Sequence, residues 1–270
     1  MPEALIHTLE CVGLVIWAYM TIWFVIGTTL KRNDVADIAW GVGFIVAALV
    51  PLFAYGFEAD RSLLTTSLVL IWGSRLAYHI FRRNVKKPED GRYVAWRNAW
   101  GKWVIPRAYG QIFLLQGLLL ILVVMPVLVI NTYRGGSWTP LDIIGLAVWV
   151  VGFFFESQGD RQLRAFIKDP SNKGKILDTG LWRYTRHPNY FGEVTQWWGL
   201  GIIALSVPYG WIGLIGPLTI TFLILKVSGV PMLERNMEKN PLFDSYRKRT
   251  SVFIPMPPKK ISDISGDSNQ

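Results

Sequence analysis

The fold is decided by the stretch Gln111-Ile-Phe-Leu-Leu-Gln-Gly-Leu-Leu-Leu-Ile-Leu-Val-Val-Met-Pro-Val-Leu-Val-Ile130, which contains no charged residue. A helix needs about 20 apolar residues to cross the hydrocarbon core of a bilayer. The stretch meets that length, and its apolar residues form a continuous block instead of alternating with polar ones. It therefore predicts a transmembrane helix.

Similar apolar blocks recur along the whole chain. With the first stretch they cover residues 4–30, 38–57, 63–81, 111–130, 141–157, 191–207 and 211–230. Charged residues make up only 17% of the chain, below the roughly 25% of soluble domains. We expect an all-α, polytopic membrane bundle of about seven helices, formed as one integrated domain over residues 1–255. Residues 256–270 are polar and are expected to form a disordered tail.

Basic residues alternate between the loops of this predicted bundle. They gather after the first, third, fifth and seventh blocks, whereas the opposite loops hold little beyond Arg61 and Arg134. The positive-inside rule then places the N-terminus outside and the C-terminus in the cytoplasm. This orientation accounts for the net charge of +9, since nucleic-acid binding would need that charge on a soluble face. The expected partner is the lipid bilayer, with no nucleic acid.

The densest polar stretch is Gly180-Leu-Trp-Arg-Tyr-Thr-Arg-His-Pro-Asn-Tyr-Phe-Gly-Glu193, where a predicted cytoplasmic loop enters the sixth block. Charged groups at membrane depth cost roughly 2.5–3.5 kcal/mol each, so they usually mark a functional site. Arg183, Arg186 and His187 can neutralise a phosphate, and a guanidinium does so with two parallel hydrogen bonds. His187 precedes a proline and should be extended, which favours a shaped loop that leads into a helix at Asn189.

A second polar cluster closes the fifth block. Glu156 and Asp160 lie four residues apart and share one helix face, close to Arg164. Two carboxylates beside arginines suit the ribose hydroxyls or the exocyclic amine of a nucleotide. The plainer interpretation is a helix end held by salt bridges.

Carboxylates also open the second block, where Asp34 and Asp37 lie three residues apart on one helix face. Either residue can be an N-cap that the helix dipole favours. Apolar residues follow Asp37 at once, so its side chain is expected to reach into the bundle, where it could act as an acid. We expect an inward-facing Arg75 to pair with a carboxylate such as Asp37.

The segment from Glu234 to Arg249 is basic and amphipathic. It is either a membrane-surface helix or a lid that clamps a cofactor with Tyr246 and Arg247. The chain has no glycine-rich nucleotide loop and no zinc-ligand spacing, so no metal is expected. The one cysteine, Cys11, allows no disulfide within the chain.

Residues 37–41, 152–160, 180–193 and 246–255 resemble the steroid 5-alpha-reductase family, specifically its bacterial branch of membrane proteins. The resemblance implies a seven-helix bundle in the bacterial inner membrane that holds NADPH in a cavity open to the cytoplasm. It also implies reduction of a carbon–carbon double bond conjugated to a carbonyl. The cofactor positions that it carries over are Asp160, Arg164, Asn189, Glu193, Tyr246 and Arg247. The family's substrate-polarising Glu and Tyr have no clean match, and Asp37 and Tyr78 stand in for them.

The Arg-His-Pro-x-Tyr-x-Gly pattern is also similar to isoprenylcysteine carboxyl methyltransferases and phospholipid methyltransferases, which bind S-adenosylmethionine at the equivalent place. The number of spans and the Asp37 cluster favour the reductase. A methyltransferase is the alternative, and a non-catalytic lipid-binding protein is a third hypothesis.

We therefore predict an NADPH-dependent reductase of an apolar small molecule, steroid-like or isoprenoid, with Asp37 and Tyr78 as catalytic residues. The sequence leaves the oligomeric state open. The predicted cofactor-binding residues are Glu156, Asp160, Arg164, Arg183, Arg186, His187, Asn189, Tyr190, Glu193, Tyr246 and Arg247.

Overall fold

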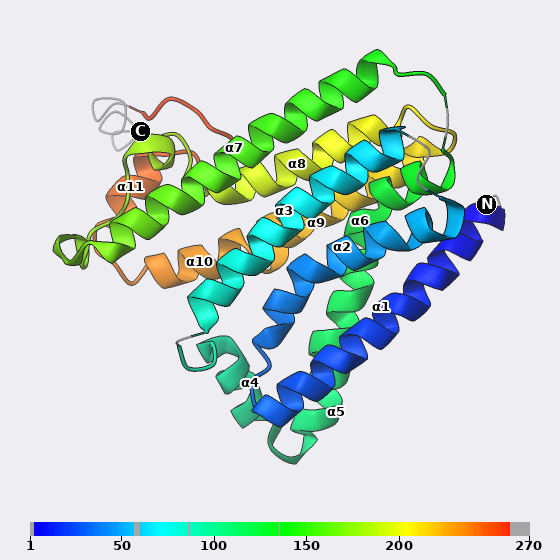
Figure 1. Ribbon diagram of the computed structural model, residues 1–270. Helices are drawn as coiled ribbons and strands as arrows, with labels where there is room; N and C mark the ends of the chain where they lie inside the picture. Colours follow the sequence, from blue (N-terminus) through cyan, green and yellow to red (C-terminus); the bar gives the residue numbers. More distant parts are fainter. Residues whose placement is uncertain (1–2, 57–59, 86, 135, 260–270) are drawn as a thin grey trace, which may run out of the picture. The chain divides into compact units, whose positions relative to one another are not determined.

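The computed structural model describes residues 3–56, 60–85, 87–134 and 136–259, which form helices joined by short loops without a β-strand (Figure 1). The longer helices are α1 (Glu3–Leu30), α2 (Val35–Tyr55), α3 (Asp60–Asn84), α6 (Leu115–Thr132), α7 (Pro140–Lys168) and α8 (Pro188–Ala204). The shorter ones are α4 (Gly91–Trp100), α5 (Val104–Ala108), α9 (Ile215–Phe222), α10 (Val230–Met237) and α11 (Phe243–Arg249). The prediction of an all-α fold is confirmed, while the predicted tail falls largely on residues 260–270, outside the described residues.

Short turns of other helix types link these elements. The 3₁₀ turns are η1 (Gly101–Trp103), η3 (Pro170–Asn172), η4 (Gly180–Arg183) and η5 (Gly210–Leu214), and the π turns are η2 (Tyr109–Leu114) and η6 (Leu223–Val227). The block at 211–230 is therefore a succession of η5, α9 and η6 instead of one regular helix. Turns of this kind at element ends and in mid-helix are often found near functional sites.

The chain divides into two compact units. The first unit comprises residues 1–142 and 200–216, and the second comprises residues 143–199 and 217–270. The unit boundaries fall inside α7, α8 and α9. The single domain expected over residues 1–255 stays a prediction.

In the first unit, α2 and α3 pack through facing glycines. A Cβ atom added at Gly73 would lie 2.7 Å from the carbonyl oxygen of Gly41, and one added at Gly41 would lie 2.9 Å from the backbone nitrogen of Ala77. Small residues allow helix backbones to approach this closely, as they do between helices in membranes. The glycines at this contact are thus packing residues, and α2 and α3 lie side by side in Figure 1.

In the second unit, α7 and α8 also pack through facing glycines. A Cβ atom added at Gly152 would lie 2.6 Å from the carbonyl oxygen of Gly192. The two helices run alongside one another in Figure 1. This close contact sets Glu156 and Asp160 of α7 against the first turns of α8, where the candidate site is built.

Five helical segments among the described residues are long and apolar enough to cross a membrane. They are Glu3–Leu30, Val35–Tyr55, Gly91–Thr132, Pro140–Lys168 and Gly210–Met237. The blocks at 63–81 and 191–207 also form helices, α3 and α8, but α8 has only 17 residues and α3 carries charged side chains at both ends and Arg75 within it. The protein is a helical membrane protein, and the count of seven spans stays a prediction.

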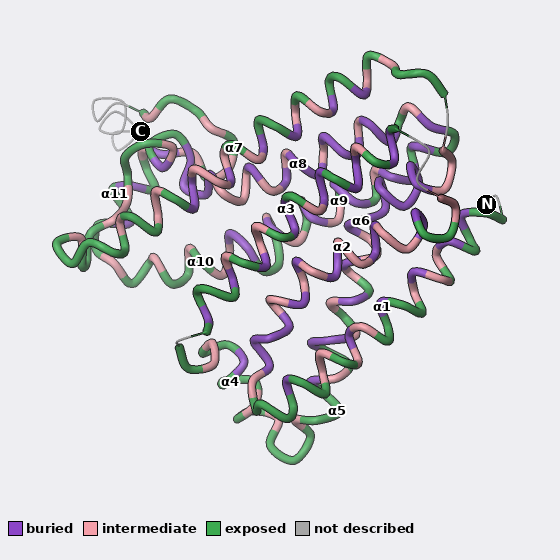
Figure 2. Tube along the Cα trace, viewed as in Figure 1, coloured by how far each residue is buried: buried purple, intermediate pink, exposed green. Residues whose placement is uncertain are grey.

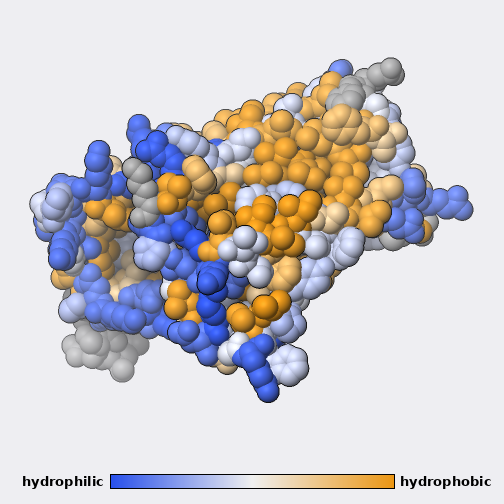
Figure 3. All heavy atoms as spheres, turned by 60° about the horizontal axis from the view of Figure 1, so that its bottom comes forward, coloured by the Kyte–Doolittle hydropathy of each residue, from blue (hydrophilic) through white to orange (hydrophobic). Residues whose placement is uncertain are grey.

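Apolar side chains cover much of the surface of these helices. Leu14 is 66% exposed, Trp17 53% and Phe53 72%. Figure 2 shows exposed and buried residues alternating along α1, and the face drawn in Figure 3 carries a broad apolar expanse. Exposed apolar patches of this extent are typical of a surface that lies in a bilayer.

The two arginines expected in the outer loops are engaged within the first unit. Arg61 is buried and donates from Nε to Oδ1 of Asp142 at 2.7 Å, and Asp142 is fully buried. Arg134 donates to the carbonyl oxygens of Tyr55 and Gly56. These two cations hold helix ends together, so the loops that contain them present little free positive charge.

Candidate functional site

The predicted motif at 180–193 forms a loop that is tied to the C-terminal segment in the second unit. Thr185 forms an isolated parallel bridge with Ser251, and the backbone nitrogen of Arg186 donates to the carbonyl oxygen of Ser251 at 2.9 Å. Helix α8 then begins at Pro188, whose fixed φ suits a first helical position. His187 lies in the loop, directly before the helix, so the shaped loop that the sequence predicts is present.

Arg186 is buried, and its side chain contacts α10 and the end of α11 in the second unit. Its Nε donates to Oε1 of Glu234 on α10 at 2.7 Å. Its Nη1 donates to the carbonyl oxygens of Arg247, at 3.2 Å, and Thr250, at 2.7 Å. These atoms hold α10 and the end of α11 to the motif, so Arg186 has a clear structural role, and its contact with a phosphate stays a prediction.

His187 is 1% exposed, and its imidazole lies between Glu234 and Tyr190. Its Nε2 is 3.1 Å from Oε1 of Glu234, and its ring stacks on that of Tyr190 with the centroids 5.7 Å apart. A carboxylate only accepts hydrogen bonds, so Nε2 carries the proton. The buried Nδ1 has no hydrogen-bond partner among the described residues. In the neutral imidazole that atom is an acceptor.

Two amide side chains on α8 are held by carboxylates on α7. Nδ2 of Asn189 donates to Oδ1 of Asp160 at 3.2 Å, and Nε2 of Gln196 donates to Oε2 of Glu156. Because each amide nitrogen faces a carboxylate, the orientation of each amide is fixed. The oxygen atoms Oδ1 of Asn189 and Oε1 of Gln196 are buried without a hydrogen-bond partner in the described part of the chain.

Three buried acceptor atoms therefore lie along this part of the chain, on His187 directly before α8, on Asn189 in its first turn and on Gln196 near its middle. Buried polar atoms in folded proteins are almost always hydrogen-bonded, so each unsatisfied one calls for an explanation such as a bound molecule. Three acceptors suit a ligand rich in hydroxyl, amine or amide N–H groups. Ribose hydroxyls and exocyclic amines have that chemistry.

The remaining predicted cofactor residues lie in varied environments of the second unit. Tyr246 is buried and donates from its hydroxyl to the carbonyl oxygen of Trp182 at 2.6 Å, and burial raises the pKa of Tyr246 above its ordinary value. Arg247 is exposed and pairs with Asp244 at 3.1 Å. Glu193 is half-buried on α8, while Arg164 on α7 and Arg183 on η4 are exposed.

The first unit has its own polar cluster, around Asp37 near the start of α2. The hydroxyl of Tyr93 donates to Oδ1 of Asp37 at 2.6 Å, and Nη2 of Arg92 donates to Oδ2 at 3.2 Å. Arg83 lies 3.8 Å from the same carboxylate. Asp37 is thus held by one hydroxyl and two guanidinium groups, and the expected pairing of Arg75 with a carboxylate stays a prediction.

The loop before α4 fixes this cluster. Asp34 is the N-cap residue of α2, as one of the two alternatives predicted, but its side chain makes no capping hydrogen bond. It accepts from Nη2 of Arg32 at 2.7 Å instead. Glu89 accepts from the backbone nitrogen of Asn33 at 2.6 Å. Asp90 caps α4 by accepting from the backbone nitrogen of Arg92 at 2.9 Å. Burial acts to raise the pKa of Asp90, but these hydrogen bonds from Arg92 hold it below the ordinary value.

Tyr78 lies apart from these contacts. Its side chain is 61% exposed, and its hydroxyl accepts from Nη1 of Arg82 at 3.1 Å. The tyrosine that contacts Asp37 is Tyr93, which was not among the predicted site residues. Glu234 was also absent from the predicted site residues. The sequence feature that could have identified it is a carboxylate on the apolar side of a basic segment.

Among the described residues, no group of three or more His, Cys, Asp or Glu side chains could hold a metal ion.

The arrangement is that of a helical membrane protein with one polar site on the motif and a second around Asp37. Comparison with known proteins places the chain in a family: it belongs to the family described as "Protein of unknown function (DUF1295)", whose model matches residues 23–250. An uncharacterised protein of Schizosaccharomyces pombe is 26% identical over 90% of this chain and 76% of its own length.

Relatives with a named activity match a smaller part of the chain. The 3-oxo-5-alpha-steroid 4-dehydrogenase 1 of Bos taurus is 30% identical over 43% of this chain, and the match covers 42% of that protein. Steroid 5-alpha-reductase DET2 of Gossypium hirsutum is 32% identical over 26% of each chain. No solved structure matches the chain significantly. The resemblance to steroid 5-alpha-reductases is confirmed.

Proposed function

We propose that this protein is a membrane reductase that uses NADPH to reduce a carbon–carbon double bond conjugated to a carbonyl in an apolar, steroid-like or isoprenoid substrate. Its similarity to 3-oxo-5-alpha-steroid 4-dehydrogenases and to steroid 5-alpha-reductase DET2 supports the reaction class. When bound, NADPH supplies the hydride for the carbon beta to the carbonyl.

The observation that carries the cofactor proposal is the set of buried acceptor atoms on His187, Asn189 and Gln196. NADPH presents ribose hydroxyls, an adenine amine and a carboxamide, and each of these groups donates hydrogen bonds. Loss of a partner for a buried polar atom costs about 1–3 kcal/mol, so a donor-rich ligand has a strong reason to occupy this site. The residues present therefore fit the cofactor.

Asp37 and its partners are the groups that we assign to the substrate carbonyl. Reduction places negative charge on the carbonyl oxygen, and preorganised donors at that oxygen lower the barrier. Arg92 donates from Nη2 to Oδ2 of Asp37 at 3.2 Å, and its guanidinium carries further N–H groups that can donate to the carbonyl oxygen. The single proton of the Tyr93 hydroxyl is donated to Oδ1 of Asp37 at 2.6 Å, so Tyr93 orients the carboxyl group. Asp37 keeps the catalytic role expected from the sequence, with Tyr93 as the residue that positions it, and a catalytic role for Tyr78 stays a proposal.

We also propose the orientation and location that the charge distribution favours. The basic loops lie in the cytoplasm, the N-terminus lies outside, and seven spans cross a bacterial inner membrane. The motif at 180–193 then faces the cytoplasm, where the dinucleotide is made available. An apolar substrate enters from the bilayer.

An S-adenosylmethionine-dependent methyltransferase is the second candidate. The same three acceptors suit the ribose hydroxyls and the adenine amine of S-adenosylmethionine, and the motif pattern is shared with lipid methyltransferases. The two proposals make opposite predictions about which cofactor binds.

Titration of the purified, detergent-solubilised protein with NADPH and, separately, with S-adenosylmethionine decides between them. We expect saturable NADPH binding that S-adenosylmethionine does not displace. The opposite ranking would establish the methyltransferase candidate, and binding of neither would leave the non-catalytic lipid-binding hypothesis.

A further inference from the structure

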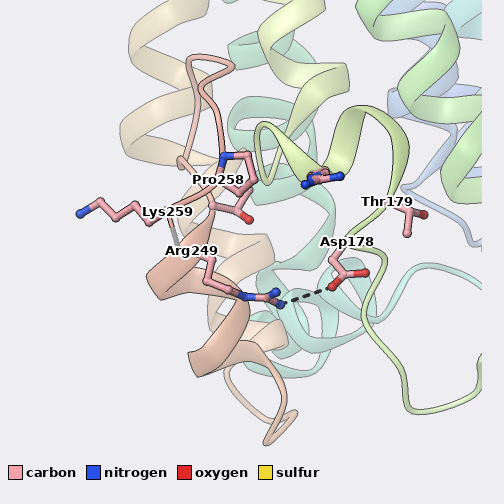
Figure 4. Close-up of a pocket in the computed structure, with 7 residues that line it drawn as sticks. Asp178, Thr179, Arg249, Pro258 and Lys259 are labelled. Carbon is pink, nitrogen blue, oxygen red and sulfur yellow. Dashed lines mark hydrogen bonds and ion pairs between the residues drawn. The ribbon is translucent and has the colours of Figure 1, made fainter. Parts of the chain in front are cut away.

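A basic pocket of about 480 Å³ lies in the second unit. Its walls come from the loop before α8, the end of α11 and the last described residues (Figure 4). This volume is within the range of small-molecule sites, roughly 300–1,000 Å³. The lining residues are Asp178, Thr179, Arg183, Arg249, Thr250, Pro258 and Lys259.

The walls of this pocket are held by hydrogen bonds within the chain. The backbone nitrogen of Met256 donates to the carbonyl oxygen of Tyr184 at 2.9 Å, and that of Lys259 donates to the carbonyl oxygen of Arg249 at 2.9 Å. The carbonyl oxygen of Thr250 accepts from Arg186 at 2.7 Å. The pocket is therefore formed in advance, which lowers the entropic cost of binding a ligand.

The charge of the lining is positive. It contains Arg183, Arg249 and Lys259 against one carboxylate, Asp178, which lies 3.3 Å from Nη2 of Arg249. Figure 4 shows Asp178 and Arg249 directed toward one another and the Lys259 side chain extending away from them. Arg183 has no ion-pair partner among the described residues. The Arg183 guanidinium thus has no opposing carboxylate in the described part of the chain, whereas the Arg249 guanidinium faces the exposed carboxylate of Asp178.

The donors at this pocket match one class of ligand. Guanidinium groups bind the oxygens of a phosphate through paired, charge-assisted hydrogen bonds. Thr179 and Thr250, whose hydroxyls are neutral donors, line the same pocket. We propose that the pocket binds a phosphate monoester group, with Arg183 and Arg249 as the main contacts and Asp178 as an opposing charge that weakens binding.

Two sources carry such a group, the 2′-phosphate that distinguishes NADPH from NADH and the headgroup of an acidic lipid such as phosphatidic acid. The shared test is titration of the full-length protein with inorganic phosphate. We expect Arg183→Gln and Arg249→Gln each to weaken that binding about tenfold, since a hydrogen bond to a charged group contributes about 1.5 kcal/mol or more. Asp178→Asn should strengthen it.

A matched control is Lys168→Gln, which removes one positive charge from an exposed position at the end of α7 that is not among the lining residues. This variant should leave phosphate binding unchanged. If it weakens binding as much as Arg183→Gln does, or if neither arginine variant has an effect, the pocket is not the phosphate site.

Two further titrations with the same variants show whether the phosphate group comes from NADPH or from a lipid. If Arg183→Gln weakens binding of NADPH but not NADH, the group belongs to the dinucleotide. If it weakens binding to phosphatidic acid vesicles compared with phosphatidylcholine vesicles, the group belongs to a lipid. If neither arginine variant changes the binding of NADPH, phosphate or vesicles, while NADPH still binds, the phosphate-site proposal is overturned and the proposed reductase is not. Arginine-dependent phosphate binding without any nicotinamide binding overturns the proposed reductase alone.

Discussion

The Nε2 atom of His187 lies 3.1 Å from Oε1 of Glu234, and the same oxygen accepts from Arg186 at 2.7 Å. Two consecutive residues of the motif are therefore anchored to one carboxylate on α10. This carboxylate favours the neutral tautomer that carries its proton on Nε2, in which Nδ1 is an acceptor. The motif at 180–193 and helix α10 are therefore joined through Glu234.

Replacement of Glu234 by Gln should destabilise the protein by roughly 3 kcal/mol, because it leaves the buried Arg186 guanidinium without its counter-charge. Thermal unfolding in detergent measures the change. Glu238→Gln is the control, because the Glu238 side chain is 56% exposed and its ion pair with Arg247, at 3.6 Å, lies at the surface. Equal loss of stability in both variants would contradict the anchoring role of Glu234.

Asn189→Ala should weaken cofactor binding roughly fivefold, because one hydrogen bond to the ligand is lost. The variant also removes the donor to Asp160. Ser157→Ala, on the neighbouring helix α7, should bind the cofactor as the parent protein does. Unchanged affinity of Asn189→Ala, measured by titration, would remove this residue from the site.

Tyr93→Phe should lower the rate of enone reduction while cofactor affinity stays the same. The substitution removes only the hydroxyl that contacts Asp37. Steady-state rates and a separate cofactor titration are the measurements, with Tyr109→Phe as a control whose hydroxyl contacts Thr21 instead. A parallel Tyr78→Phe variant tests the tyrosine that stands in for the family's catalytic tyrosine. A loss of rate in the Tyr78 variant, with no loss in Tyr93→Phe, would assign the catalytic tyrosine to position 78.

Gly152→Ala should destabilise the protein by about 1–3 kcal/mol, since the added methyl group would collide with the backbone of α8. We also expect weaker cofactor binding because α7 and α8 position Glu156 and Asn189. Gly13→Ala is the matched control, as an added Cβ there has open space around it. Similar unfolding temperatures for the two variants would argue against the close packing of α7 and α8.

The capping carboxylate Asp90 should give the protein a stability that depends on acid pH. Its pKa is lowered in the folded state, so its contribution is fully present above the ordinary value of 3.8 and is lost as the pH falls through the lowered pKa. Unfolding temperatures measured across this acid range should fall less steeply for Asp90→Asn than for the parent. Identical slopes would show that Asp90 does not contribute.

The sequence alone predicted the elements that rest on local rules. Long apolar blocks indicated the helices, and the proline after His187 indicated the loop that precedes α8. The partners of charged groups could not be predicted in this way. Tyr93 reaches Asp37 through a loop folded back onto α2, and Glu234 reaches His187 across 47 residues. Such contacts depend on tertiary packing, which residue spacing does not encode.

Transfer of deuterium from the nicotinamide ring tests the central claim most directly. The purified protein is incubated with NADPH that carries deuterium on the hydride-donating face and with a panel of steroidal and isoprenoid enones, and the products are analysed by mass spectrometry and NMR. We predict a saturated ketone that carries deuterium on the carbon beta to the carbonyl. Unchanged enones, together with methyl transfer from S-adenosylmethionine to a lipid by the same preparation, would contradict the account.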